Sequence, residues 1–391
     1  MSLFSEKKKQ RVIAVFDMAS ASVGGMLIKQ DKEGKPEIIS SRRVSVNFLL
    51  DIDFDAFWRC ARGALKKILE QLLKDFPKGP DTALCVFFSP WFISQTKIID
   101  IEKEKPFKIT EDFFEKLMKD EEEFFKKKWS SKLEPLRGEP EFIEHEILKT
   151  ELNGYHTNSP INKTAKKIKA YIHMSLGIKE VKDDIEKEVL KNFGDISLQF
   201  KTFPMVAFKI LNGIINTKDG LILVDIGGEI TELSLIRNDN LEETVSFSRG
   251  RNFLLRKIAS EFNAFPDEAE SVMQTYLNGH ADENSSQKIS LIIEEVKKEW
   301  REFFYKALKI IFENKPLPQN IFLVSDDPAS KEFIKCAEED FSAKFTILGK
   351  PFIVSKIMPE GIAHYFNPPA ALDKGKDIFL MIESIFANKI L

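Results

Sequence analysis

Cysteine, histidine and net charge are scarce in this 391-residue sequence, and each shortage excludes a class of protein. The three cysteines lie far apart in apolar or helical surroundings, which indicates reduced thiols in a cytosolic protein and no disulfide framework. The five histidines show no metal-ligand spacing, so we expect no zinc site. Basic and acidic residues number 58 and 61, and a net charge of −3 gives no field that would favour nucleic acid.

Long apolar segments are also missing. No run of about 18 uncharged apolar residues occurs, so the sequence predicts no membrane-spanning helix. The lysines at 7–9 precede an apolar run that Asp17 interrupts, which argues against a signal peptide. A hydrophobic share of 43% and a charged share of 30% are typical of a globular protein, here long enough for two or three domains.

Residues 221–232 form a distinctive stretch, Leu-Ile-Leu-Val-Asp-Ile-Gly-Gly-Glu-Ile-Thr-Glu. A buried strand that stops at Asp225 and turns on Gly227 and Gly228 can present backbone N–H groups and an acid at one point. A phosphate or Mg²⁺ site requires this combination, and glycine permits the close approach. An ordinary hairpin turn explains these residues equally well.

A weaker copy of this pattern near the start favours the phosphate site. Residues 11–16 are an apolar run that ends at Asp17, and small residues and a second apolar run, 23–28, follow. Each half then continues with a third strand and a helix, which is an internal duplication at the level of pattern. Two such subdomains facing one another would bring Asp17 and Asp225 to a common cleft. The third strands and helices are expected at 38–46 and 54–76, and at 243–248 and 251–262.

The duplicated pattern does not need residues 89–200, which we interpret as an inserted α+β subdomain. Insertions of this kind usually carry partner contacts and not chemistry. The expected organisation is a first half at 1–88, the insert at 89–200, a second half at 201–372 and a C-terminal helix at 373–391. Within the second half, Ser-Asp-Asp-Pro at 325–328 has the pattern of an N-cap acid followed by proline at the first helical position, and we expect it to open a helix that ends at residue 341.

The C-terminal segment 377–391 has an amphipathic helical pattern. Ile378, Ile382 and Phe386 share one face, and Ser384 and Asn388 lie opposite. The helix could dock on the protein core or lie on a membrane surface. The small number of basic residues favours docking.

The order of strand, Asp17 turn, insert and Val-Asp-Ile-Gly-Gly at 224–228 resembles the actin-like ATPase superfamily. Within it, the sequence is similar to the branch of the bacterial cell-division protein FtsA and the pilus-assembly protein PilM, whose strand-helix-strand-strand domain occupies the position of the insert. Ser-Pro-Trp-Phe-Ile-Ser at 89–94 and Leu-Asn-Gly-Tyr at 152–155 also lie where these proteins have comparable pieces. The resemblance implies an α/β fold of duplicated, ribonuclease-H-like subdomains around a nucleotide cleft.

ATP and Mg²⁺ are the ligands that this resemblance implies. Asp17 and Asp225 would hold Mg²⁺ through water. The residues that would cradle the nucleotide are Ser20, Ser22, Gly227, Gly228, Thr231 and Gly250.

The phosphate loops depart from the family pattern. Ala19 replaces a glycine of the first loop, and Glu229 and Ile230 replace glycine and threonine of the second. A carboxylate at Glu229 would repel a triphosphate. Where the family places a glycine pair under the adenosine, this chain has Asp-Asp-Pro at 326–328, which would crowd the nucleotide. We therefore expect weak or lost ATP binding and at most a weak ATPase activity.

Three functions follow from the resemblance. The preferred one is an FtsA-like scaffold of the cell-division machinery, which links partners at the cytoplasmic membrane face. The alternative is a PilM-like adaptor of type IV pilus assembly that binds a peptide of an inner-membrane protein. An active actin-fold kinase is less favoured because the loops are degenerate. The implied contacts are a cytoskeletal or membrane-protein partner at residues 89–200, self-association, and peripheral membrane contact through the C-terminal helix of a cytoplasmic protein.

Overall fold

The computed structural model describes most of the chain, in several parts. They are residues 11–30, 34–133, 138–215, 220–312, 316–325, 333, 335–338, 340–347, 349–367 and 375–391. The Asp-Asp-Pro segment at 326–328, and most of the helix expected to open at Ser325, lie outside the described residues.

The first half is built on a five-stranded sheet in the order β3-β2-β1-β4-β9. β1 pairs antiparallel with β2 and parallel with β4, and both β1 and β4 are buried along their length, as expected for strands covered on both faces. α1 begins at the N-cap Asp53 and packs its apolar side on this sheet. The elements are β1 (Val12–Met18), β2 (Ser22–Gln30), β3 (Pro36–Ser45), α1 (Phe54–Asp75), β4 (Thr82–Phe87), α3 (Lys179–Phe193) and β9 (Ser197–Thr202).

The second half repeats this topology. Its sheet has the order β12-β11-β10-β13-β14, with β10 antiparallel to β11 and parallel to β13, so the duplication predicted from the sequence is confirmed. The strands are β10 (Leu221–Ile226), β11 (Thr231–Arg237), β12 (Asn240–Phe247), β13 (Asn320–Val324) and β14 (Ile353–Lys356). The helices are α4 (Phe203–Ile214), α5 (Arg251–Phe262), α6 (Pro266–Leu277), α7 (Glu283–Phe312), α9 (Pro359–Ile362) and α10 (Ile378–Ile390), with short 3-10 turns at Lys335–Glu338, Asp340–Phe345 and Ala363–Tyr365.

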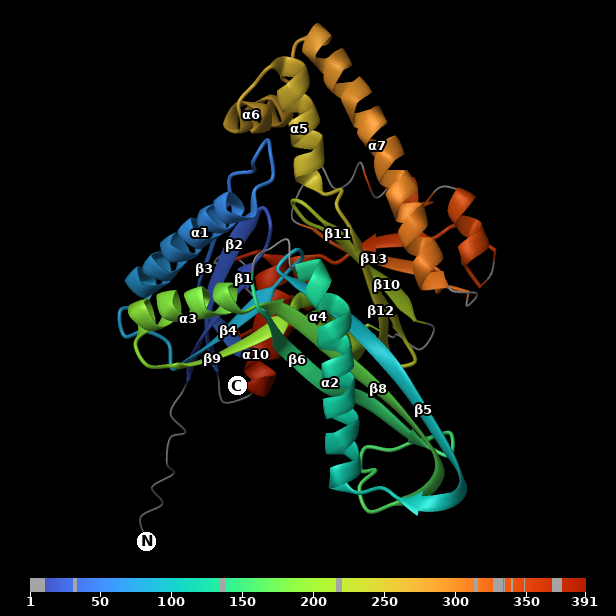
Figure 1. Ribbon diagram of the computed structural model, residues 1–391. Coiled ribbons are helices and arrows are strands. Elements are labelled where there is room, and N and C mark those ends of the chain that lie inside the picture. Colours follow the sequence, from blue (N-terminus) through green and yellow to red (C-terminus); the bar gives the residue numbers. More distant parts are fainter. Residues whose placement is uncertain are drawn as a thin grey trace.

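The insert is a separate antiparallel sheet in the order β5-β8-β6-β7, which extends away from the two halves with α2 lying across it (Figure 1). Its elements are β5 (Phe92–Lys108), α2 (Glu111–Leu133), β6 (Pro140–Leu152), β7 (Tyr155–His156) and β8 (Thr164–Ile178). The insert therefore ends at Ile178 and not at residue 200. α3 and β9 belong to the first half, because β9 pairs in parallel with β4 and completes the first sheet.

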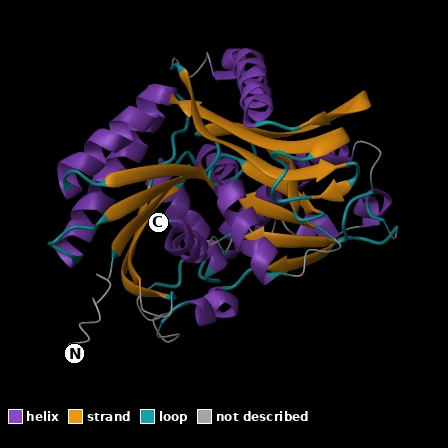
Figure 2. Cartoon of the chain, turned by 90° about the horizontal axis from the view of Figure 1, so that it is seen from below, coloured by secondary structure: helices purple, strands orange, loops and turns teal. Residues whose placement is uncertain are grey.

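α10 is docked in the interior, as the small number of basic residues suggested. It packs with α4, β1, β2 and β10 in one apolar cluster that joins both halves. Figure 2 shows the C-terminus beside a helix in the middle of the molecule, with strands on both sides. Ser384, assigned to the polar face, is buried and donates a hydrogen bond to Met26 Sδ. The membrane-surface alternative is wrong for this conformation, because the apolar side chains of α10 are already removed from water.

Candidate functional site

The two acids predicted from the duplicated pattern lie on the central strands of the two sheets. Asp17 in β1 pairs with Gly24 of β2, and Asp225 in β10 pairs with Glu232 of β11. A cavity of about 240 Å³ lies between the two loops that follow these strands. Besides the loops, its walls include Arg43, Phe88, Ser89, Arg251, Gln274 and Phe379.

Arg43 of β3 forms a two-pronged ion pair with Asp17. Arg43 Nη2 lies 2.5 Å from Asp17 Oδ2 and Nη1 lies 3.1 Å from Oδ1, while the Gly24 N–H donates to Oδ1 at 2.9 Å. Burial raises the pKa of the Asp17 carboxyl, although Arg43 opposes that rise. Burial alone would lower the pKa of Arg43, but attraction by Asp17 and Asp377 raises it well above its ordinary value. The guanidinium therefore stays charged.

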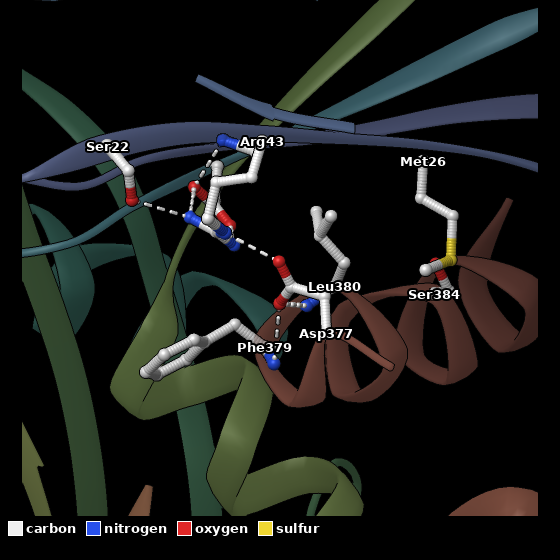
Figure 3. A network of polar contacts seen from close by, with 9 residues as sticks. Ser22, Met26, Arg43, Asp377, Phe379, Leu380 and Ser384 are labelled. Atoms are coloured by element: carbon white, nitrogen blue, oxygen red, sulfur yellow. Dashed lines mark hydrogen bonds and ion pairs between the residues drawn. The ribbon is translucent and has the colours of Figure 1, made fainter. Parts of the chain in front are cut away.

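The other edge of the guanidinium holds the start of α10. Arg43 Nε donates to Asp377 Oδ2 at 2.5 Å, and Nη1 donates to Ser22 Oγ at 2.8 Å (Figure 3). Asp377 is also the N-cap of α10, because its Oδ1 accepts the N–H groups of Phe379 and Leu380, both at 3.1 Å. Phe379 lines the cavity and packs edge-on against Phe88. The C-terminal segment thus contributes Phe379 to the wall of the cavity and Asp377 to the ion pair with Arg43.

The loops that follow Asp17 and Asp225 contact each other directly. Ser20 Oγ accepts the Glu229 N–H at 2.9 Å, which joins the first loop to the second. A Cβ atom on Gly228 would lie 2.7 Å from Ala21 Cβ, so glycine is required for this approach. Gly250 is equally constrained, since a Cβ atom there would lie 2.4 Å from the carbonyl oxygens of Gly227 and Gly228.

The start of α5 donates its hydrogen bonds to the second loop. Arg251 N donates to Gly227 O at 3.0 Å, and Asn252 N donates to Gly228 O at 2.8 Å. The first N–H groups of a helix have no partner within the helix and often bind phosphate. Here these two groups are used inside the protein.

Glu229, which was expected to repel a triphosphate, does not line the cavity, and its carboxylate is bound by an amide and a guanidinium group. Its Oε1 accepts from Asn252 Nδ2 at 2.8 Å and from Arg256 Nη2 at 2.6 Å. Arg256 Nε also donates to Leu49 O of the first half at 2.8 Å. Glu229 therefore fastens the second loop to α5 and, through Arg256, to the other half.

Thr231 and Glu232 both lie beside the cavity but do not line it. The Thr231 hydroxyl donates to Arg249 O at 2.7 Å and accepts from Trp300 Nε1 at 3.1 Å, so its bonds lie within the second half. Glu232 accepts the Ser89 hydroxyl at 2.6 Å. Burial raises the pKa of the Glu232 carboxyl to about 7, because the Ser89 bond only partly offsets the lost hydration.

Glu383 of α10 is a further buried acid near this network. It is fully buried, and neither of its carboxyl oxygens has a hydrogen-bond partner within the described part of the chain. Burial raises the pKa of Glu383 well above its ordinary value, and the charge of Asp17 raises it further. These effects favour the neutral, protonated carboxyl.

The structure brings most of the predicted site residues to one place. Ser20, Ser22, Gly227 and Gly228 line the cavity together with both acids, and Gly250 packs behind the second loop. The sequence analysis missed Arg43, Ser89, Asp377 and Phe379. Ser89 stands in the Ser-Pro-Trp motif that carried part of the resemblance, whereas nothing local in the sequence marks the other three.

A magnesium ion does not fit the residues around Asp17. Mg²⁺ needs near-octahedral oxygen ligands at about 2.0–2.1 Å and gives up its waters reluctantly. Both Asp17 oxygens already accept hydrogen bonds, and the Arg43 guanidinium would face the ion. Two unit positive charges roughly 4 Å apart near a protein surface repel by about 4 kcal/mol, and a dication doubles this.

Clusters of metal-ligating side chains and membrane-spanning helices are both absent from the described ranges. No group of three or more histidine, cysteine or acidic side chains there is arranged to hold a metal ion. None of the helices in these ranges combines the length and the apolar character needed to cross a bilayer.

Comparisons with known proteins agree with this architecture. No protein-family model and no curated protein matches the sequence. A chain of the PilM–PilN type IV pilus biogenesis complex superposes with a TM-score of 0.65 at 15% identity, over 96% of this chain and 98% of that one.

Two further solved structures match more weakly. The ethanolamine utilization protein EutJ from Carboxydothermus hydrogenoformans has a TM-score of 0.43 and 13% identity, over 94% of this chain and 90% of its own. A Bacteroides thetaiotaomicron protein with an actin-like ATPase fold has a TM-score of 0.42 and 8% identity, over 95% and 98%. From the duplicated sheets, the inserted antiparallel sheet and the near full-length likeness to the pilus-complex chain, this protein has the actin-like ATPase fold.

Proposed function

We propose that this chain is a PilM-like adaptor, an actin-fold protein that binds a segment of a membrane protein at the cytoplasmic face of a type IV pilus machinery. The observation that carries the proposal is the likeness to a chain of the PilM–PilN complex, which extends over 96% of this chain and includes the insert. The FtsA-like role in cell division is the second choice, because no comparable observation supports it.

Two acids at the cleft, Asp17 and Glu229, support a structural role over catalysis. A kinase needs a carboxylate that is available to the acceptor hydroxyl. Here Asp17 is engaged by Arg43, and the Glu229 carboxylate is engaged by Asn252 and Arg256. These acids therefore serve to hold the structure together, which suits a scaffold or adaptor.

The insert is the part of the chain that we assign to the partner. Two aromatic side chains in it are exposed, Phe124 on α2 at 55% and Tyr155 on β7 at 80%. Aromatic side chains are enriched at the energetic centres of protein interfaces, since they bury a large area at low entropic cost. The insert also extends away from both halves, where a partner can reach it (Figure 1).

Isothermal titration calorimetry tests the proposal. The titrants are synthetic peptides that cover the cytoplasmic segments of single-span membrane proteins encoded next to this chain. We expect one of them to bind saturably at micromolar affinity, and Phe124→Ser or Tyr155→Ser to weaken it. Leu190→Ser on α3, exposed by 37% outside the insert, is the matched control. Failure of every peptide, or equal weakening by the control, would contradict the proposal.

A nucleotide is the second candidate ligand, and it concerns only the cleft. The observation in its favour is the cavity between the loops, lined by Ser20, Ser22, Gly227 and Gly228. Its volume of about 240 Å³ lies below the roughly 300–1,000 Å³ that is usual for ligand pockets. Separation of the loops would enlarge the cavity and would break the Ser20–Glu229 hydrogen bond.

A further inference from the structure

We infer that Arg43 occupies, as a cation tethered to the chain, the position that a magnesium ion would need at Asp17, so that this cleft works without a divalent metal. The inference goes beyond the proposed function, since it concerns the chemistry of the cleft whichever partner binds. It also contradicts the metal site that the resemblance implies.

The geometry at Asp17 suits an arginine. The carboxylate is fully buried, and its two oxygens accept three hydrogen bonds, two from Arg43 and one from the Gly24 N–H. A planar guanidinium matches a carboxylate with two parallel bonds, which makes such a pair both strong and directional. Three of the roughly four lone-pair sites of the carboxylate are thus occupied, and a metal ion that took the place of the guanidinium would have to break both of its bonds to Asp17.

The backbone of β2 makes room for the arginine. Asp17, Gly24 and Arg43 occupy paired positions on β1, β2 and β3. A Cβ atom on Gly24 would lie 2.6 Å from Arg43 Nη2 and 2.7 Å from Asp17 Oδ2. The absence of a side chain at the middle position therefore permits Arg43 to cross β2 and reach the acid.

The guanidinium of Arg43 pairs with two carboxylates. Asp377 pairs with its outer edge, so Arg43 joins two carboxylates as a bound metal ion would. The second carboxylate comes from the N-cap of α10, which places the C-terminal helix in the same network. The contacts of Arg43 therefore join β3 to β1, to β2 and to the start of α10.

The backbone donors that remain around the cleft point to the same conclusion. The Glu229 N–H is bound by Ser20 Oγ, and the Arg251 and Asn252 N–H groups are bound by carbonyls of the second loop. A metal-bound triphosphate relies on such donors as well as on the acid. These particular donors already have partners within the protein.

Manganese binding measured by electron paramagnetic resonance tests the inference on the full-length chain. Mn²⁺ serves as the probe for Mg²⁺, because free Mn²⁺ gives a signal that disappears on binding. We expect the signal of Mn²⁺ to be the same with and without the wild-type protein. Uptake of one Mn²⁺ per chain that is lost in Asp17→Asn would overturn the inference.

Arg43→Met provides the second arm. Removing the tethered cation leaves Asp17 beside Asp377, and we expect Mn²⁺ affinity to rise by about tenfold or more. The double variant Arg43→Met/Asp17→Asn should abolish this gain. A folded Arg43→Met protein, verified by circular dichroism, that gains no affinity would also contradict the inference. If this variant does not fold, the wild-type measurement still decides. Peptide binding can be measured in EDTA and does not depend on either Mn²⁺ measurement. A failure of the metal inference is therefore distinguishable from a failure of the proposed adaptor role.

Discussion

Arg43 reaches the Asp17 carboxylate by crossing β2 at a position where the chain has no side chain. Asp17, Gly24 and Arg43 form one row across three strands. The matching row of the second half reads Asp225, Glu232 and Ser246. The duplicated halves therefore keep the first acid and differ in the other two positions: Asp17 forms an ion pair with Arg43, whereas the row of Asp225 contains no basic residue.

The Gly24 position provides a direct test of this row. Gly24→Ala would place a Cβ atom within 2.7 Å of both partners and push Arg43 off Asp17. We expect the free energy of unfolding to fall by about 2–4 kcal/mol, because a buried ion pair is broken and the strands are crowded. Urea denaturation measures this change.

Gly63→Ala is the matched control for Gly24→Ala. Gly63 lies inside α1, and a Cβ atom there meets nothing within 4 Å. Alanine in a helix interior should raise stability by roughly 0.5–1 kcal/mol. Equal stability of the two variants would show that Arg43 does not need the gap at Gly24.

Asp377 tests the link between the cleft and the C-terminal helix. Asp377→Asn retains an N-cap side chain but loses the charge that faces Arg43, and we expect a loss of about 1 kcal/mol in unfolding free energy. Asp377→Ala removes the cap as well and should cost about 1 kcal/mol more.

The corresponding two variants at Asp53 separate the effect of the cap from the effect of the charge. Asp53 caps α1 by accepting the Ala56 N–H at 2.8 Å and lies at the exposed start of that helix. Asp53→Asn should leave the stability unchanged, while Asp53→Ala should lose about 1 kcal/mol. If Asp377→Asn is as stable as Asp53→Asn, the Arg43–Asp377 pair contributes nothing measurable.

The sequence predicted those features that depend on local pattern. The apolar runs ending at Asp17 and Asp225, each followed by small residues, were sufficient to predict two similar halves and a shared cleft. Confirmation came from the matching strand orders. The small-residue loops line the cavity as predicted, because each loop directly follows the strand that ends at its acid.

Features that depend on pairing between distant segments could not be predicted. The role of Arg43 follows from the register of three strands. The role of Asp377 follows from where α10 docks, because Asp377 lies 334 positions after Arg43 in the sequence. The end of the insert was misplaced because β9 is assigned by its pairing with β4. Similarly, Ser384 suggests a polar face in the sequence, but its hydroxyl is satisfied by Met26 in the interior.

Ser20 tests whether the two halves are held together at the loops. Ser20→Ala removes the acceptor of the Glu229 N–H, and an unpaired buried donor costs about 1–3 kcal/mol. We expect faster hydrogen exchange in peptides that cover residues 19–22 and 227–231. Ser22→Ala is the control, because Ser22 accepts from Arg43 within the first half. Equal exchange of residues 227–231 in both variants would contradict a role for Ser20 between the halves.

Glu232 predicts how stability depends on pH. Its pKa rises from an ordinary 4.5 to about 7 in the folded protein, because burial disfavours the charged carboxylate. Between these two values the unfolded chain has released the proton that the folded protein still holds, so stability falls as the pH rises from about 4.5 to about 7. Below that window the contribution of Glu232 is fully present, and above it the loss is complete.

Glu232→Gln should remove this dependence. The amide oxygen can still accept the Ser89 hydroxyl, and glutamine carries no charge to desolvate. We expect the variant to be more stable than the wild type by roughly 3–4 kcal/mol at pH 8 and equally stable near pH 4, since the shift from 4.5 to about 7 is worth about 1.4 kcal/mol per pKa unit. Urea denaturation at both pH values measures the difference, with the exposed Glu186→Gln as the control. A gain at pH 8 no larger than that of Glu186→Gln would mean that Glu232 is ionised without cost in the folded protein, and that burial at the Ser89 contact does not hold its proton.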